Sequence, residues 1–160
     1  NQRQNLVPIS PILPGEFKEE TIFILKSLGE NSNSEMHQDT FSGIAKGFIY
    51  LQNMDNSNSP FEYLEGSYLD ANFRSTQTNR AVLEGDRFSS GSTRIRELVL
   101  EDALSRYHLK TFTGKKGLLV IANTAGYHRK GAHRSQKPRI TINFEIKRKG
   151  ILGKAITNLI

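Results

Sequence analysis

The stretch RITINFEIKR, residues 139–148, alternates strictly between apolar and polar side chains. Its apolar members are Ile140, Ile142, Phe144 and Ile146, and the side chains between them are Thr141, Asn143, Glu145 and Lys147. Because successive side chains of an extended chain point to opposite faces, this period of two predicts a β-strand. Upstream, GLLVIAN (residues 117–123) is a continuous apolar run, typical of a strand buried on both faces.

Three further segments predict strands earlier in the chain. TIFILKSL (residues 21–28) is rich in β-branched and apolar residues, and residues 44–51 are apolar or aromatic except Lys46 and Gly47. FEYLEGSY (residues 61–68) resumes the alternation after a polar turn, so we expect it to pair with residues 44–51 like a hairpin. Residues 1–16 contain Pro8, Pro11 and Pro14 and predict an extended arm without a regular element.

Residues 68–116 form a different zone, a long insert between the fourth and later strands. It is polar and predicted to be irregular up to Ser92, and it then contains one predicted helix in TRIRELVLEDALSRY, with Ser92 or Thr93 as the N-cap. The apolar residues at helical spacing are Ile95, Leu98, Val99 and Ala103. Long loops in compact domains are commonly lids or binding surfaces, or else disordered, and both readings stay open here. Many short strands and one helix predict a mainly β sandwich or barrel, with a jelly roll among the candidates.

Composition limits the class of protein. A chain of 160 residues with 36% hydrophobic residues fits one domain with its own core. No apolar run approaches the roughly 20 residues needed to cross a bilayer, and the N-terminus lacks the blocks of a signal peptide, so we expect no membrane partner and a cytoplasmic location. Since the chain has no cysteine, any metal site must use histidine, aspartate or glutamate.

The net charge of +6 is concentrated locally, in HRKGAHRSQKPR (128–139) and IKRKGILGK (146–154). A basic surface attracts nucleic acid through counterion release, which makes a nucleic-acid binder one hypothesis. A solvated basic edge and attraction of a small anionic substrate explain the same cluster. We expect no nucleic-acid partner.

His37 and Asp39 stand two residues apart, so an extended chain places them on the same face. His128 follows 91 residues later, directly after the buried-strand run, where a sandwich can bring a late strand beside an early one. Two histidines and one carboxylate form the facial triad of non-haem Fe(II) oxygenases. We expect the other histidines, His108 and His133, to be surface residues.

Arg139 opens the final predicted strand, 11 residues after His128. A guanidinium binds a carboxylate through two parallel hydrogen bonds and is more weakly hydrated than an ammonium group. It therefore suits the distal end of a dicarboxylate, although an arginine at a strand edge is the simpler interpretation of this residue alone.

Residues 36–68 and 114–148 together resemble the two signature blocks of the phytanoyl-CoA dioxygenase-like family of Fe(II)/2-oxoglutarate oxygenases. The two blocks cover 68 of the 160 residues. They hold the family's His-x-Asp, its distal histidine and its arginine 11 positions later, in the family's order.

The resemblance implies a double-stranded β-helix in which His37, Asp39 and His128 bind Fe(II) and Arg139 pairs with the C5 carboxylate of 2-oxoglutarate. Dioxygen would then oxidise a substrate C–H bond, with release of succinate and CO2. Related halogenases have a small residue in place of the carboxylate ligand, so Asp39 favours hydroxylation. Lys46 and Tyr50 share one strand face and are further candidates for 2-oxoglutarate contacts, but an outward lysine and a packed aromatic explain them equally well.

Three departures from the family stand out. Lys130 replaces the Ser or Thr that several members have two residues after the distal histidine, and Tyr68 replaces a frequent histidine. Family members also have a longer N-terminal part whose helices cover one sheet, whereas 36 residues precede His37 here. We expect either a minimal version of the fold or the C-terminal portion of a longer protein; a sheet without such helices would expose an apolar face that favours oligomerisation or instability.

The substrate and the oligomeric state cannot be read from the sequence. Arg74, Arg80 and Arg87 suggest an anionic group on a small-molecule substrate, although a solvated loop explains them as well. A non-catalytic jelly-roll binding module that retains the ligand set is the alternative to an enzyme.

Overall fold

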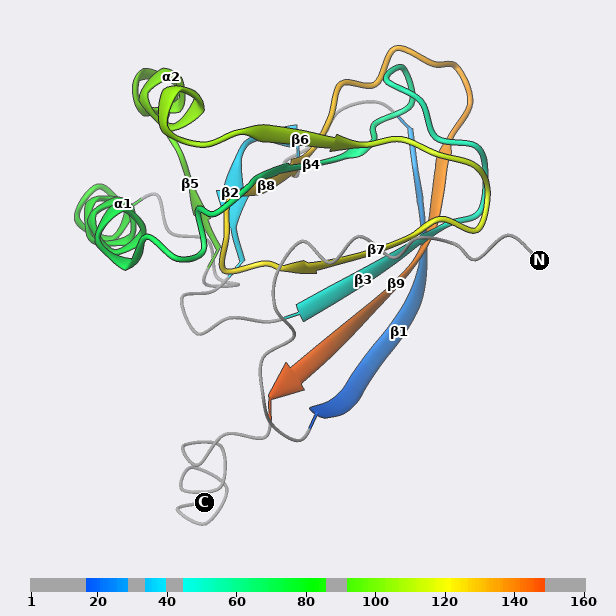
Figure 1. Cartoon of the computed structure of the whole chain (residues 1–160), viewed down its shortest axis with the longest axis horizontal. Coiled ribbons are helices and arrows are strands. Elements are labelled where there is room, and N and C mark those ends of the chain that lie inside the picture. The colour runs from blue at the N-terminus through cyan, green and yellow to red at the C-terminus, as the bar shows by residue number, and fades with distance from the viewer. Residues whose placement is uncertain (1–16, 29–33, 40–44, 86–91, 149–160) are drawn as a thin grey trace.

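The computed structural model describes residues 17–28, 34–39, 45–85 and 92–148, and these residues form two antiparallel β-sheets (Figure 1). The first sheet has the strand order β1-β9-β3-β7. Its strands are β1 (Phe17–Ser27), β9 (Arg139–Arg148), β3 (Ala45–Tyr50) and β7 (Leu119–Asn123). The alternating stretch that begins at Arg139 is thus a central strand, paired with β1 on one side and β3 on the other.

The second sheet has the order β5-β2-β8-β4-β6. Its strands are β5 (Thr93–Arg94), β2 (His37–Gln38), β8 (His128–Lys130), β4 (Phe61–Leu64) and β6 (Leu109–Phe112). β2 and β8, which carry the two histidines, are neighbours although the sequence separates them widely.

An apolar core lies between the two sheets and joins β3 and β7 of the first to β4 of the second. Its buried members are Phe48, Tyr50, Met54, Phe61, Tyr63, Val120 and Ala122. A second cluster, around Met36, Leu64 and Tyr127, packs the helices against the five-stranded sheet. The fold is therefore mainly β and jelly-roll-like, as predicted.

The described residues contain two helices, α1 (Ala71–Leu83) and α2 (Glu97–Arg106), where the sequence predicted one. α1 lies in the segment expected to be irregular. Asp70 caps it by accepting a hydrogen bond from Phe73 N at 2.8 Å. Its buried face mixes Phe73 and Ala81 with the polar Arg74 and Gln77, so the apolar periodicity is too weak to predict a helix.

The start of α2 also differs from the prediction. Arg96 is the N-cap residue, in place of Ser92 or Thr93. Thr93 is instead paired with Gln38 between β5 and β2, and Ile95 N donates to Met36 O at 2.8 Å. These sheet contacts hold the chain extended for a few residues longer than the sequence indicates.

The predicted pairing of residues 44–51 with 61–68 is wrong. β3 and β4 belong to different sheets and face each other across the core, so the turn-rich segment between them carries the chain from one layer to the other. The strand predicted over 21–28 is confirmed and begins earlier, at Phe17. The arm predicted over residues 1–16 lies outside the described residues.

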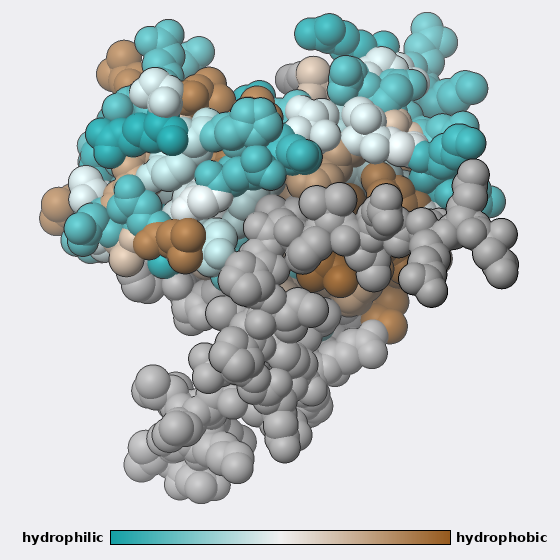
Figure 2. All heavy atoms as spheres, in the orientation of Figure 1, coloured by the Kyte–Doolittle hydropathy of each residue, from teal (hydrophilic) through white to brown (hydrophobic). Residues whose placement is uncertain are grey.

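The outer face of the four-stranded sheet is apolar. In β9 the buried side chains are Arg139, Thr141 and Asn143, whereas Ile142 and Phe144, on the other face, are only half-buried. Ile22 and Ile24 of β1 pair with Phe144 and Ile142 and are 62% and 68% exposed. Figure 2 shows apolar side chains at the surface of the molecule. No helix in the described ranges has both the length and the apolar character needed to cross a membrane.

Candidate metal centre and adjoining cavity

Sheet pairing brings the two histidines together. His37 of β2 lies directly opposite His128 of β8, and their ring centroids are 4.5 Å apart. Asp39 follows β2, and its backbone N donates to Thr124 O at 2.9 Å. The turn before β8 therefore holds the carboxylate on the same side as both rings.

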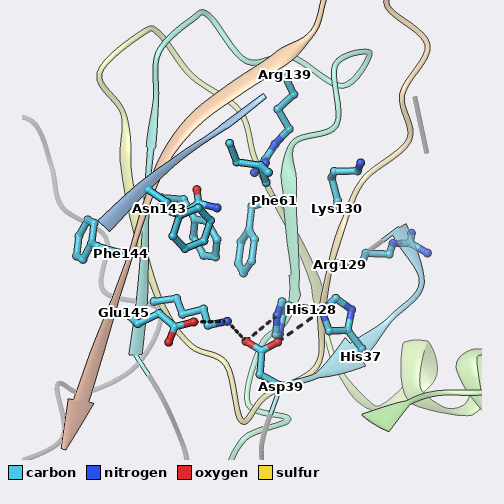
Figure 3. Close-up of a pocket in the computed structure, with 14 residues that line it drawn as sticks. His37, Asp39, Phe61, His128, Arg129, Lys130, Arg139, Asn143, Phe144 and Glu145 are labelled. Carbon is cyan, nitrogen blue, oxygen red and sulfur yellow. Dashed lines mark ion pairs between the residues drawn. The ribbon is translucent and has the colours of Figure 1, made fainter. Parts of the chain in front are cut away.

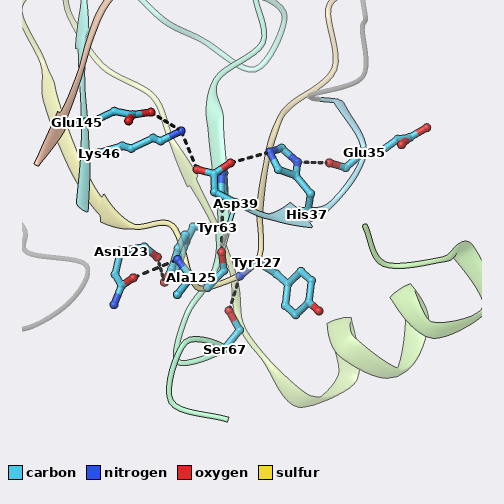
Figure 4. Close-up of polar contacts among 12 residues, drawn as sticks. Glu35, His37, Asp39, Lys46, Tyr63, Ser67, Asn123, Ala125, Tyr127 and Glu145 are labelled. Atoms are coloured by element: carbon cyan, nitrogen blue, oxygen red, sulfur yellow. Dashed lines mark hydrogen bonds and ion pairs between the residues drawn. The ribbon is translucent and has the colours of Figure 1, made fainter. Parts of the chain in front are cut away.

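The turn that positions His128 is stabilised by side chains from several elements (Figure 4). Asn123 Oδ1 accepts a hydrogen bond from Ala125 N at 3.1 Å, and the Tyr63 hydroxyl donates to Asn123 O at 2.9 Å. A Cβ atom at Gly126 would lie 2.0 Å from the Tyr63 hydroxyl oxygen, so only glycine fits there without rearrangement. The backbone around the second histidine is consequently held in one conformation.

Hydrogen bonds to the backbone determine which nitrogen of each imidazole faces the centre of the site. His37 Nδ1 lies 2.7 Å from Glu35 O, and His128 Nδ1 lies 2.9 Å from Gly126 O. Because a carbonyl oxygen can only accept, both Nδ1 atoms carry the proton when the rings are neutral. Both Nε2 lone pairs are then directed at Asp39, in the arrangement that backbone carbonyls impose on metal-binding histidines.

The three potential ligand atoms surround one point. His37 Nε2 lies 3.8 Å from Asp39 Oδ1, His128 Nε2 lies 3.7 Å from Asp39 Oδ2, and all three ligand atoms fall within 4.8 Å of one another. Bonds of about 2.1 Å at right angles would separate neighbouring ligand atoms by about 3 Å. The residues therefore fit a first-row metal ion if the ligand atoms move closer together, by less than about 1 Å for each histidine–Asp39 pair and by less than about 2 Å for any pair.

Burial keeps both histidines in the form that binds metal. Burial, together with the neighbouring His128, lowers the pKa of His37 from its ordinary value of 6.5 to about 3. Burial also lowers the pKa of His128, although Asp39 opposes this effect. Both rings are neutral near pH 7, so a metal ion would not have to displace a proton from either one.

Asp39 is held by a lysine as well as by the histidines. Lys46 Nζ lies 2.9 Å from Asp39 Oδ2 and 2.9 Å from Glu145 Oε1. Burial would raise the pKa of Asp39, but its electrostatic interactions with His128 and Lys46 outweigh burial, so the pKa falls below its ordinary value. The carboxylate is therefore ionised and ready to bind a cation.

A cavity of about 230 Å³ extends from this triad between the two sheets (Figure 3). Its walls include Phe48 and Phe61 from the core and Arg129, Lys130 and Arg139 from the basic segment. Arg139 is 4% exposed; its Nη1 donates to Thr141 Oγ1 at a long 3.4 Å, and its guanidinium carbon lies 5.9 Å from the Tyr50 ring centroid. The cavity thus has two carboxylates, two imidazoles and a lysine at one end, and a buried guanidinium at the other.

The structure brings together most residues that the sequence singled out. His37, Asp39 and His128 form one cluster, with Arg139 in the same cavity. The Tyr50 hydroxyl donates to Phe112 O and accepts from Phe61 N, both at 3.0 Å.

The remaining histidines lie outside the cluster of potential ligands. His108 Nδ1 is 2.8 Å from Glu65 Oε2 on the surface, as predicted for a surface histidine. His133 Nδ1 is 2.9 Å from Ser59 Oγ, and the ring is half-buried, which corrects the expectation of a surface residue.

The polar cavity residues that were not predicted include Asn143 and Glu145. Both have the same parity as Arg139 along β9, so they share its face. The sequence shows this parity, but it does not show that the polar face of this strand is the inner one.

Solved structures of proteins that bind iron or depend on alpha ketoglutarate share this fold. EctD from S. alaskensis with bound Fe matches with a TM-score of 0.58 at 12% identity, covering 84% of this chain and 46% of that chain. The non-heme alpha ketoglutarate dependent carbocyclase SnoK matches with a TM-score of 0.56 at 14% identity, covering 90% and 57%. The non-heme alpha ketoglutarate dependent epimerase SnoN matches with a TM-score of 0.53 at 10% identity, covering 84% and 48%.

The chain spans about half the length of these solved structures. Another EctD structure contains 2-oxoglutarate and 5-hydroxyectoine, and another SnoN structure contains Fe3+ and alpha ketoglutarate. No protein-family model matches the sequence, and no curated protein does. At these identities the likeness concerns the fold.

Proposed function

We propose that this chain is the catalytic domain of an Fe(II)- and 2-oxoglutarate-dependent dioxygenase of the phytanoyl-CoA dioxygenase-like type, with a double-stranded β-helix as its fold. One observation carries the proposal. Two imidazoles present Nε2 lone pairs, and Asp39 presents its carboxylate, to one point at the end of a cavity that also holds a buried arginine. These residues suit a site in which a bound metal and the arginine hold the two ends of a dicarboxylate cosubstrate.

In this proposal His37, Asp39 and His128 hold Fe(II). The bound iron and 2-oxoglutarate would supply the oxidation chemistry, in which dioxygen hydroxylates a substrate C–H bond and succinate and CO2 are released. Three protein ligands leave positions open for the cosubstrate and dioxygen. Because the carboxylate ligand is present, hydroxylation is favoured over halogenation.

Arg139 would pair with the distal carboxylate of 2-oxoglutarate. The guanidinium is almost completely buried, and a carboxylate partner would offset the cost of desolvating it. Tyr50 would contribute from beside Arg139, where its ring and its bonded hydroxyl limit the movement of the guanidinium. Lys46 would act at the other end of the cavity, on Asp39 or on the bound cosubstrate. Phe48 and Phe61 would exclude water between the two ends.

The substrate would be a small molecule, with dioxygen as the second reactant. Residues 1–160 would form a single oxygenase domain, and residues 68–116, which contain α1, β5, α2 and β6, would form a lid over the substrate. Among the arginines proposed to suggest an anionic substrate, Arg80 is bonded to Gln77 Oε1 at 2.6 Å, and Arg87 lies outside the described residues. We place the protein in the cytoplasm.

The test is turnover of 2-oxoglutarate under defined conditions. Purified protein is loaded with Fe(II) without oxygen, mixed with 2-oxoglutarate and then exposed to air, and succinate is measured by mass spectrometry. We expect succinate from the natural sequence, none from His37→Ala, and much less from Arg139→Met because the distal carboxylate loses its partner.

Two results would contradict this reading. Succinate formation that persists in His37→Ala would rule out the proposed ligands. Iron-dependent binding of 2-oxoglutarate without any turnover, with a broad set of candidate substrates present, would instead support a binding module that retains the ligand set. Calorimetric titration of 2-oxoglutarate with and without metal separates these cases.

A further inference from the structure

Asn143 occupies a special position in the cavity. It lies on the inner face of β9, between Arg139 and Glu145, and so between the two polar ends of the cavity (Figure 3). In the sheet it is paired with Phe23 of β1 on one side and with Phe48 of β3 on the other. Its amide is therefore a polar group inserted between two aromatic side chains.

The Asn143 amide is buried without its full set of hydrogen bonds. The residue is 8% exposed, and Oδ1 is inaccessible and has no hydrogen-bond partner among the described residues. Burying an amide oxygen without a hydrogen-bond partner costs free energy, and most buried polar groups in native proteins have a protein, water or ligand partner. Two other buried asparagines have hydrogen bonds: Asn58 Nδ2 donates to Asn53 O at 3.0 Å, and Asn123 Oδ1 accepts from Ala125 N at 3.1 Å.

We propose that Asn143 is a cosubstrate-binding residue whose amide N–H donates a hydrogen bond to bound 2-oxoglutarate. The inference rests on the proposed function and adds a contact between the one made by Arg139 and those made at the metal. A carboxylate or keto oxygen of the ligand needs a hydrogen-bond donor. Asn143 Oδ1 is inaccessible, so the NH2 group is the part of the amide that can face the cavity, and it can donate from the position it already occupies.

A role in ligand binding and a role in folding predict opposite effects of an apolar substitution. Leucine has nearly the shape of asparagine and would remove an unsatisfied polar group from an apolar neighbourhood, so Asn143→Leu should keep or raise the melting temperature. If Asn143 instead served the fold, the same substitution should lower it. The melting temperature therefore distinguishes a cosubstrate contact from a structural residue.

The experiment measures 2-oxoglutarate binding by calorimetry to protein loaded with Mn(II), which supports binding without turnover. The variants are Asn143→Leu and Asn143→Asp, and the control is Asn56→Asp, the same change of charge at an exposed position between β3 and β4. We expect Asn143→Leu to weaken 2-oxoglutarate binding about 10- to 100-fold, the usual range for a hydrogen bond to a charged group. Asn143→Asp should weaken it further because its carboxylate repels the ligand, and Asn56→Asp should leave it unchanged.

Mn(II) binding in the absence of cosubstrate is the second measurement. It should change less than twofold in Asn143→Leu and Asn56→Asp, since neither removes a proposed ligand or adds a charge to the cavity, whereas the new carboxylate of Asn143→Asp should strengthen it. Binding of 2-oxoglutarate to Asn143→Leu within twofold of the natural sequence would overturn the inference, and so would a lowered melting temperature with unchanged affinity. If Asn143→Leu does not fold, Asn143→Asp, which preserves size and polarity, decides by the same affinity criterion. A natural sequence that binds Mn(II) but no 2-oxoglutarate would overturn the proposed function as well.

Discussion

The buried histidines should make the metal-free protein lose stability as the pH falls. In the folded chain the pKa of His37 is about 3, whereas an unfolded histidine titrates near 6.5. Between these values the unfolded chain binds more protons than the folded one, so the free energy of unfolding decreases as the pH drops below 6.5. The lowered pKa of His128 acts in the same direction.

The size of the effect follows from the two values for His37. At pH 5 an unfolded histidine is almost fully protonated, while the folded one stays neutral. The unfolded pKa lies about 1.5 units above this pH, which corresponds to a loss of roughly 2 kcal/mol in the free energy of unfolding. At pH 7.5 the same group contributes almost nothing. Ordinary carboxylates remain ionised at pH 5, so they add little over this range. Since small domains are stable by only about 5–15 kcal/mol, the loss should be easy to measure.

The assay is urea unfolding at four values between pH 7.5 and pH 5.0, with a chelator present to remove metal. Far-UV circular dichroism is the suitable probe because the chain contains no tryptophan. His37→Gln should reduce the loss of unfolding free energy between pH 7.5 and pH 5.0 by about 2 kcal/mol. The control is His108→Gln, because the His108 side chain is 72% exposed and its replacement should leave the dependence intact.

Two outcomes would refute the reasoning. One is a natural sequence that loses less than about 0.5 kcal/mol between pH 7.5 and pH 5, which would mean that the imidazoles are not buried as the structure has them. The other is an unchanged pH dependence in His37→Gln, which would assign the titration to another group.

Two further predictions concern the support of the site. Lys46→Met removes the cation between the partly buried Asp39 and Glu145 and should cost about 1–3 kcal/mol of metal-free stability, while Mn(II) should raise the melting temperature more than in the natural sequence. Calorimetric melting with and without Mn(II) checks both, and an equal rise would contradict the role given to Lys46. Gly126→Ala should lower the free energy of unfolding by about 1–3 kcal/mol and weaken Mn(II) binding, because the added Cβ displaces the Tyr63 hydroxyl from the turn before His128. An unchanged Mn(II) affinity, measured by calorimetry, would show that this turn does not position the ligand.

Local patterns predicted several elements well. β9 coincides with the alternating stretch, and β7 and β3 lie within the apolar runs. α1 escaped prediction because its buried face includes Arg74 and Gln77, whose burial depends on tertiary contacts. The expected hairpin failed for a similar reason, since a turn-rich segment can join strands of one sheet or of two, and only packing distinguishes the cases.

The sequence by itself determined that Arg139, Thr141, Asn143 and Glu145 share one face of a strand, because the alternation of an extended backbone is local. The tertiary structure alone decided that this polar face is the inner one, since burial depends on what other strands place against it. The same holds for the proposed metal site. His37 and Asp39 are close through local geometry, whereas His128 joins them only through the pairing of β2 with β8.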